Sequence, residues 1–413
     1  MADEIALTVL DFGARGDGLA DETRAFQAAL DAAAVRGERV LVPAGQFHIS
    51  GTLSIPPGVT LEGTWAGPHT SMVERGTVLL AYSGRDDETA TPFISLTHNS
   101  TLKGVTIYYP EQRPQDIHPY PWTIQGRGQH YNVIDVTLAN AYNGVDCGTY
   151  HNEGHHLRNV LGCCLRRGVL VDQCTDIGRL ENVHIHSVYW WRIHYPEGHL
   201  SREETGAVNA FTLEHLEGFI IGRTDWEYIS NSFVIWAKVG FRFVHTDTPA
   251  GGTGNAVITQ SGSDIGPLAV LVEETQSHAG VAFENCQFMS GFDIAASNRG
   301  PVKLSNCGFW GRAGAGSQMV LHGSGAVFLT ATHFSAWDQA GSGAPCIDAR
   351  AGKLFLNGVD FMDAGPAGPH ISLASGVTYA SIVGVSTASD SLRIANDSDV
   401  EIQALGPWEE VTT

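Results

Sequence analysis

The chain has 413 residues, with 24 Lys and Arg against 44 Asp and Glu, which gives a formal net charge of −20 at pH 7. Nucleic acids and anionic membrane surfaces bind clustered Lys and Arg side chains, and the sequence has no basic run, so neither is an expected partner. No stretch approaches the apolar length that a bilayer-spanning helix needs. The 48 glycines indicate a turn-rich β protein.

The first sixty residues contain one expected helix and three short strands. Asp21 is the expected N-cap of an amphipathic helix of about four turns that ends near Gly37. The apolar stripe of this helix consists of Phe26, Ala29, Leu30 and Ala33. We expect the helix to cover the open end of a stack of strands, because a bare end would expose apolar side chains and strand edges. The strands are expected at 40–42, 47–49 and 59–61.

A short apolar-x-apolar pattern recurs along the rest of the chain, in several places at intervals of 21 to 31 residues. It is found at 105–107, 136–138, 183–185, 286–288, 307–309, 332–334 and 359–361. A period of this size is typical of a solenoid, and no helical pattern separates the repeats. The sequence therefore predicts an all-β fold, a single parallel β-helix domain over residues 1–413.

Asparagine precedes many of the expected strands, where a turn needs a residue that tolerates the left-handed conformation. These positions are Asn132, Asn159, Asn182, Asn285 and Asn306. Alternation along each strand turns the first and third residues of a triplet inward and the middle one outward. Cys286 and Cys307 take inward positions and are expected to be buried thiols.

Four phrases near the N-terminus carry a resemblance to a known family. They are DFGARGDG at 11–18, DETRAFQAAL at 21–30, VPAGQFHISGTL at 42–53 and GVTLEG at 58–63. Together they resemble the N-terminal signature of the pectate-lyase superfamily of right-handed parallel β-helix proteins. The resemblance implies that residues 1–63 form a helical cap and the first coils.

The same resemblance implies a groove that binds a glycan. The superfamily contains polysaccharide lyases, glycoside hydrolases, fructan-cleaving transferases, epimerases and phage tailspikes. The catalytic motifs of its polygalacturonases are missing from this sequence, and so is an Asp-rich calcium cluster of the pectate-lyase kind. The family therefore predicts a glycan ligand without fixing the reaction.

Asp225 and Glu227 are the predicted catalytic pair. Aligning 226–228 with 183–185 turns Glu227 outward beside His184, and Asp225 lies on the same face two residues earlier. Two neighbouring carboxylates can act as general acid and as base or nucleophile in glycosidic bond cleavage. The alternative is an Asp in a turn and an exposed Glu without a catalytic role. Other candidates for the second carboxylate are Glu197, Glu203 and Asp146.

Substrate-binding residues are predicted on two loops and on the outward strand positions. Residues 187–206 form a long insertion expected to lie over the groove, and a loop between 108 and 130 is rich in Pro and aromatic residues. Aromatic rings on such loops suit stacking on sugar faces. The predicted binding residues are His184, His186, Trp190, Trp191, Arg192, His194, Glu197, Trp122, Tyr109 and Asp146. Alternatively, the insertion mediates contacts between subunits and the aromatic loop packs onto its own coil.

The predicted function is cleavage or transfer of glycosidic bonds in an oligo- or polysaccharide, with no metal and no organic cofactor. One alternative is a lyase that acts on a uronate-containing glycan by β-elimination, with His184, Tyr189 and Arg192 in the catalytic roles. Another is a non-catalytic glycan-binding protein that resembles a tailspike. A homotrimer is possible. The N-terminus predicts a cytoplasmic protein if the chain is complete, or a secreted one if a signal peptide has been removed.

Overall fold

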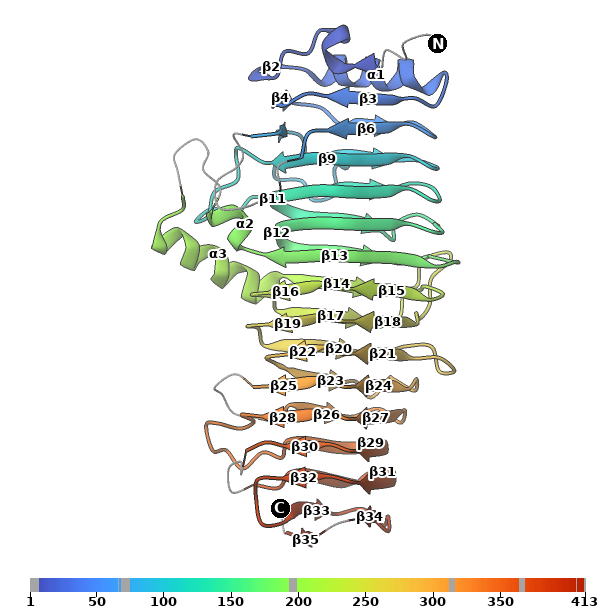
Figure 1. The fold of residues 1–413 in the computed structure, drawn as a ribbon, viewed down its shortest axis with the longest axis vertical. Helices are drawn as coiled ribbons and strands as arrows, with labels where there is room; N and C mark the ends of the chain where they lie inside the picture. Colours follow the sequence, from blue (N-terminus) through green and yellow to red (C-terminus); the bar gives the residue numbers. More distant parts are fainter. Residues whose placement is uncertain are drawn as a thin grey trace. The chain divides into compact units, whose positions relative to one another are not determined.

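The computed structural model describes residues 7–65, 67, 75–192, 199–311, 316–363, 368–405 and 407–411. The chain forms two compact units, residues 1–220 with 248–250 and residues 221–247 with 251–413. Within each unit, short strands stack in parallel register, coil upon coil (Figure 1). The predicted parallel β-helix is thereby confirmed. No helix in the described ranges has the length and apolar character to cross a bilayer.

The first unit begins with β1 (Leu7–Thr8), and its strands form three parallel columns. One column contains β3 (Arg39–Val42), β6 (Thr60–Gly63), β9 (Thr101–Tyr108), β11 (Asn132–Cys147), β12 (His156–Val171) and β13 (Gly178–His186). A second contains β2 (Asp17–Asp21), β4 (Gly45–Ile49) and β7 (Thr77–Ala81), and continues through later residues of β9, β11, β12 and β13. The third contains β5 (Leu53–Ile55), β8 (Ile94–Leu96), β10 (Trp122–Gly126), the ends of β11 and β12, and β14 (Glu217–Ile221). Long strands such as β11 therefore bend and serve more than one column.

The second unit also has three columns of parallel strands. One contains β15 (Glu227–Ser230), β18 (Ala256–Thr259), β21 (Val281–Glu284), β24 (Val302–Ser305), β27 (Ala326–Thr330), β29 (Ile347–Asn357), β31 (Ile371–Val383) and β34 (Gln403–Leu405). Another contains β16 (Phe233–Ile235), β19 (Gly262–Asp264), β22 (Gln287–Phe288), β25 (Gly308–Trp310), β28 (His333–Ser335), β30 (Asp360–Phe361) and β32 (Ser386–Thr387). The third contains β17 (Val239–Phe243), β20 (Leu268–Val272), β23 (Gly291–Ile294), β26 (Met319–Leu321), the starts of β29 and β31, β33 (Leu392–Asn396) and β35 (Trp408–Glu410).

The capping helix is confirmed, with different ends. A 3-10 turn (Val9–Phe12) precedes it, and α1 (Thr23–Ala34) packs against β3 and β5 with its predicted stripe buried. Its N-cap is Glu22, whereas the Asp21 carboxylate accepts hydrogen bonds from the backbone and hydroxyl of Thr23. The last helical residue is Ala34, three residues before Gly37, whose left-handed φ of 69° stops the helix from continuing.

A left-handed residue marks the corner before the middle strand in most coils. Asn159, Asn182, Asn285 and Asn306 have φ between 52° and 55°, as predicted. In the coil of β11 the left-handed residue is Asp135, and Asn132 instead opens the strand. These side chains bond from coil to coil. The Asn182 amide donates to Asn159 at 2.9 Å, the Asn159 amide to Asp135 at 2.7 Å and the Asn306 amide to Asn285 at 2.6 Å.

The core of the second unit is a stack of phenylalanines. Phe309 and Phe334 lie with their ring centroids 4.7 Å apart and nearly parallel, and Phe334 and Phe361 continue the stack at 5.6 Å. Cys286 and Cys307 are buried free thiols, which confirms their inward placement. Burial of this kind stabilises each coil against its neighbours.

Candidate functional site

The structure contradicts the outward placement of Glu227. Its side chain is fully buried, and its Oε2 accepts a hydrogen bond from the Thr224 hydroxyl at 3.1 Å. In the same strand Tyr228 is exposed and Ile229 is buried, so the alternation is the reverse of the predicted one. The proposal that Glu227 and Asp225 form an exposed carboxylate pair on one face is therefore wrong.

Two features explain the error. Trp226 has φ 66°, a left-handed conformation that interrupts the strand alternation between Asp225 and Glu227. In addition, β15 belongs to the column of β18 and β21, in register with Ala256 and Val281, rather than to the column of β16 and β22. The middle outward position of this coil is taken by Phe233, which pairs with Gly262.

The sequence contained a signal for the correct alignment. Asn231 is left-handed at φ 50° and directly precedes Ser232-Phe233-Val234, in the same way that Asn182 precedes Val183-His184-Ile185. An Asn that directly precedes the triplet therefore identifies 232–234, rather than 226–228, as the equivalent of 183–185.

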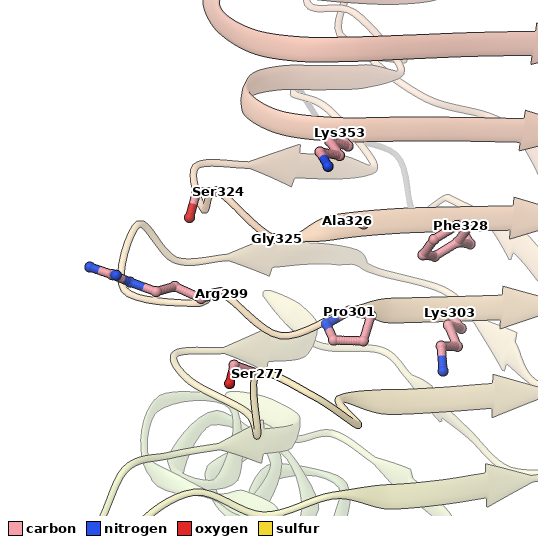
Figure 2. Close-up of a pocket in the computed structure, with 9 residues that line it drawn as sticks. All are labelled: Ser277, Arg299, Pro301, Lys303, Ser324, Gly325, Ala326, Phe328 and Lys353. Atoms are coloured by element: carbon pink, nitrogen blue, oxygen red, sulfur yellow. The ribbon is translucent and has the colours of Figure 1, made fainter.

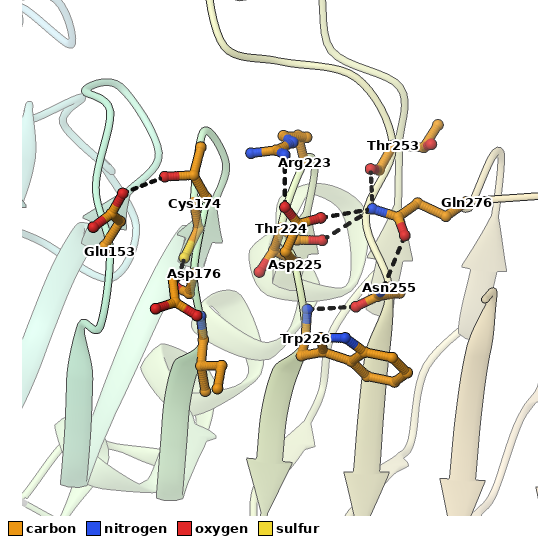
Figure 3. Close-up of polar contacts among 12 residues, drawn as sticks. Glu153, Cys174, Asp176, Arg223, Thr224, Asp225, Trp226, Thr253, Asn255 and Gln276 are labelled. Atoms are coloured by element: carbon orange, nitrogen blue, oxygen red, sulfur yellow. Dashed lines mark hydrogen bonds and ion pairs between the residues drawn. The ribbon is translucent and has the colours of Figure 1, made fainter. Parts of the chain in front are cut away.

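Asp225 is held in a turn by its neighbours (Figure 3). One carboxylate oxygen, Oδ2, lies 2.6 Å from Nη2 of Arg223, and Oδ1 accepts from the Gln276 amide at 3.0 Å. The Asn255 side chain in turn accepts from the Trp226 backbone and donates to Gln276 at 2.8 Å. These bonds give Asp225 a structural role, because both of its oxygens already have partners.

His184 and His186 face outward, as predicted, and a different pair of groups meets there. His184 Nδ1 lies 2.7 Å from the Tyr189 hydroxyl, and the rings of the two histidines stack at 5.9 Å. Tyr189 comes from α2 (Val188–Trp191), whose first backbone N–H donates to His186 Nδ1 at 3.0 Å. The short helix thus positions a phenol against an imidazole.

The surroundings shift the pKa values of this pair apart. Burial lowers the pKa of His184 below its ordinary 6.5, and burial raises the pKa of Tyr189 from 10.0 to about 12. The pKa of His186 falls to about 3 because of burial, with smaller contributions from His184 and Arg192. At neutral pH all three side chains are therefore uncharged, with a basic imidazole next to a protonated phenol.

The other predicted residues of the insertion lie in different environments. Trp190 is 3% exposed and packs inward, so it offers no stacking face. Trp191 is half-buried beside the His186 ring at 5.9 Å, and the exposed Arg192 guanidinium lies 5.8 Å from the Trp191 ring centre. His194 and Glu197 lie outside the described residues. Glu203 lies on α3 (Arg202–His215) and accepts from Gln115 at 3.3 Å.

The second column of the first unit, which contains β7 and the later residues of β9, β11, β12 and β13, is partly covered. Thr106 and Thr137 occupy its outward positions but are buried, and the indole N–H of Trp65 donates to the Thr137 hydroxyl at 3.0 Å. Helix α2 packs against β11 and β12, and α3 packs against β12. The outward strand positions are therefore closed at these two rungs, whereas Leu161 and His184, the next two outward residues of the column, are partly accessible.

Tyr109 and Asp146 are interior residues. Tyr109 is fully buried, with its hydroxyl 2.9 Å from that of Thr123, and burial raises its pKa. Asp146 is also fully buried and accepts from the backbone of Gly148 and Thr149 and from the Gln125 amide, at 2.7 to 2.9 Å. The prediction that they contact substrate is not supported by this geometry.

Trp122 belongs to a charged cluster that the sequence did not reveal. It is 8% exposed, and the Arg167 guanidinium lies over its ring at 5.5 Å. Glu88 pairs with both Arg166 and Arg167 at 3.0 Å and also accepts from the Asn143 amide at 3.2 Å. Glu88 is far from these arginines in sequence, so only the coil stacking could bring them together.

Comparison with known proteins confirms the family resemblance. Residues 6–173 match the family model described as rhamnogalacturonase A/epimerase, pectate lyase-like. A stretch of 44 residues is 57% identical to mannuronan C5-epimerase AlgE5 of Azotobacter vinelandii, covering 10% of this chain and 4% of that protein. A stretch of 67 residues is 43% identical to AlgE4 of the same organism, covering 14% and 12%. The matches thus span only a small part of these curated relatives.

A solved structure shares the fold over nearly the whole chain. The N-terminal fragment of gene product 12 from bacteriophage Phi29 superposes with a TM-score of 0.60 at 13% identity. The superposition covers 97% of this chain and 72% of that one. At this level of identity the likeness concerns the fold alone.

Proposed function

We propose that the protein modifies a polysaccharide that contains sugar acids, by removing the proton from the carbon next to the carboxyl group. The observation that carries this proposal is the 2.7 Å contact between His184 Nδ1 and the Tyr189 hydroxyl on the outward face of β13. The match to mannuronan C5-epimerases and to an epimerase family model supports the same class of reaction. The family match ends at residue 173, so the roles given to His184 and Tyr189 rest on their geometry.

The two side chains suit opposite proton-transfer roles. With its proton on Nδ1, the His184 imidazole donates to the Tyr189 oxygen, and Nε2 is the basic nitrogen that takes the proton from carbon. The phenol O–H then serves as the proton donor. Donation to the leaving glycosidic oxygen gives β-elimination, whereas return of a proton to the opposite face of the carbon gives epimerisation.

The exposed Arg192 supplies positive charge in the same segment. A guanidinium that pairs with the sugar carboxylate makes the neighbouring C–H more acidic, because it stabilises the negative charge that develops as the proton leaves. Trp191 lies against both His186 and Arg192 and offers an apolar surface for the sugar ring.

Hydrolysis by Asp225 and Glu227 is less well supported. A catalytic carboxylate has to reach the glycosidic bond, but Glu227 is buried and Asp225 is engaged with Arg223 and Gln276. β-Elimination, one of the two alternatives predicted from the sequence, begins with the same proton abstraction, and the contact between His184 and Tyr189 supports this step.

The proposal is tested on a panel of uronic acid polymers and neutral glycans. Elimination is followed by the ultraviolet absorbance of the unsaturated product, and epimerisation by proton NMR of the polymer. Tyr189→Phe and His184→Gln are each expected to lower kcat at least about 100-fold, because each removes a proton-transfer group. Tyr228→Phe and His333→Gln are matched controls, since these residues lie outside the pair.

Circular dichroism of each variant checks that the fold is intact. Full activity of both Tyr189→Phe and His184→Gln would refute the assignment of these roles. Turnover of neutral glycans alone, with release of reducing ends, would instead favour a hydrolase. Tight binding of glycans without turnover on any of them would favour the non-catalytic alternative.

A further inference from the structure

A hollow of about 400 Å³ lies on the outer face of one strand column of the second unit (Figure 2). Its walls come from successive coils, at the starts of β24, β27 and the second half of β29, and from the turns that precede them. The residues that matter for its chemistry are Arg299, Pro301, Lys303, Ala326, Phe328 and Lys353. The volume falls in the range of about 300 to 1,000 Å³ that is typical of small-ligand sites.

Strand register explains why these side chains meet. Lys303 pairs with Phe328, which pairs with Phe355, so the three side chains lie on one face of neighbouring strands. Ala326 pairs with Lys353, two residues earlier along the same strands. The small Ala326 side chain leaves the hollow between the two lysines, whose strands are two rungs apart, or roughly 10 Å.

An aromatic ladder forms one side of this face. The rings of Phe328 and Phe355 stack at 4.5 Å and 12°, and Phe355 continues to Tyr379 at 5.0 Å. These rings are only half-buried, unlike the phenylalanines of the core. Because Phe355 covers one face of Phe328, the other side of that ring, towards Lys303, borders the hollow.

The charge of the hollow is opposite to that of the chain. Arg299, Lys303 and Lys353 are exposed, and over the described ranges none of the three forms an ion pair with a carboxylate. Elsewhere in this unit Arg223, Arg242 and Arg350 each pair with an acidic side chain. In a protein of net charge −20, three cations without acidic partners around one hollow favour an anionic occupant.

We propose that this cation–aromatic face, defined by Arg299, Lys303, Phe328 and Lys353, binds a segment of an acidic oligosaccharide. Carboxylates of the sugar acids pair with the lysines and Arg299, and the C–H faces of a sugar ring contact Phe328. Since Lys303 and Lys353 are on strands two rungs apart, an occupant has to carry at least two negative charges to use both. The choice of sugar acids rests on the proposed function, because the face would hold more of the same polymer.

The test measures binding in the full chain carrying Tyr189→Phe, so that turnover does not consume the ligand. The probe is a mannuronate octamer, and a neutral glucose octamer is the reference. Isothermal titration calorimetry measures the dissociation constant of each at low and at high salt. Lys303→Ala combined with Lys353→Ala is expected to weaken octamer binding about 5- to 30-fold, the effect of two charge pairs. Lys238→Ala, which removes an exposed lysine in the bend before β17, is expected to leave binding unchanged.

The outcomes separate this site from the reaction. If no uronic acid polymer is turned over but the octamer binds, and binds more weakly to the double variant, the binding face is supported and the proposed function is refuted. If turnover is seen but the double variant binds the octamer as tightly as the Lys238→Ala control, the face is refuted. A single-stranded DNA oligomer of equal charge that binds as tightly as the octamer would also overturn the assignment to sugar acids.

Discussion

Mild acid is expected to destabilise the C-terminal coils of the second unit through His370. This ring is fully buried between Trp337 and Phe361, with centroid distances of 5.4 and 5.0 Å. Its Nδ1 accepts from the Arg393 backbone N–H at 3.0 Å, which leaves the proton of the neutral ring on Nε2, 2.9 Å from the Thr387 hydroxyl. The environment therefore suits the neutral imidazole and opposes a second proton.

The magnitude follows from the pKa. Burial, with a smaller contribution from the Arg393 charge, lowers the pKa of His370 from 6.5 to about 4. In the unfolded chain the ring binds a proton at a higher pH than in the folded chain, so the free energy of unfolding rises with pH between these two values. The contribution of His370 is complete above pH 6.5 and is lost as the pH falls to about 4. This difference between the folded and unfolded pKa values corresponds to a loss of about 3 kcal/mol in the free energy of unfolding.

The assay compares wild type with His370→Gln by urea unfolding at pH 7, 5.5 and 4. Glutamine does not titrate, so the stability advantage of wild type over the variant should shrink by about 3 kcal/mol between pH 7 and 4. Subtracting the two unfolding free energies at each pH cancels the contributions of the titrating groups that wild type and variant share, including His184 and His186. NMR titration of the His370 ring measures the folded pKa directly, and His333→Gln serves as a control at an outward position.

Two results would refute this reasoning. One is a His370 resonance that titrates near 6.5 in the folded protein. The other is a constant difference in unfolding free energy between wild type and His370→Gln over the whole pH range. Either result would mean that protonation of the buried ring costs little free energy, even though a protonated Nδ1 no longer accepts the hydrogen bond from Arg393.

Two further predictions concern the reaction. Because the pKa of His184 is lowered and the imidazole acts as a base, kcat/KM should stay high as the pH falls through 6.5 and decline only below it, as a pH–rate profile of wild type would show; a midpoint above 6.5 would contradict this role. Glu227→Gln should retain turnover within about threefold, because the buried side chain does not reach the substrate, and a loss of about 100-fold would restore the carboxylate mechanism.

The fold could be predicted because its signals are local and repeated. A left-handed Asn before an apolar-x-apolar triplet is a property of a few adjacent residues. The coils can therefore be recognised even where the residues between two triplets show no pattern. The amphipathic stripe of α1 was equally clear, since Phe26, Ala29, Leu30 and Ala33 recur with helical spacing. The ends of that helix were less certain, because Asp21 and Glu22 both offer a carboxylate and the backbone geometry decides between them.

The candidate site could be predicted only in part. His184 and His186 were placed outward correctly because they alternate with Val183 and Ile185 in an unbroken strand. Glu227 was misplaced because the three strand columns have similar alternation, and a single triplet does not reveal its column. The pairing of Tyr189 with His184 depends on a four-residue helix, and the sequence offered no signal for its direction.

An outward position on a β-helix strand is not the same as an accessible one, and the two units illustrate the difference. In the first unit Trp65, α2 and α3 cover the strands, so that Thr106 and Thr137 are buried although they point away from the core. His184 and His186 stay partly open there, and burial lowers the pKa of each. In the column of the second unit that carries the hollow, outward residues such as Lys303 and Lys353 stay exposed and have no acidic partner among the described residues. Partial burial thus suits the first surface to proton transfer, and exposure with unpaired charge suits the second to binding an acidic chain.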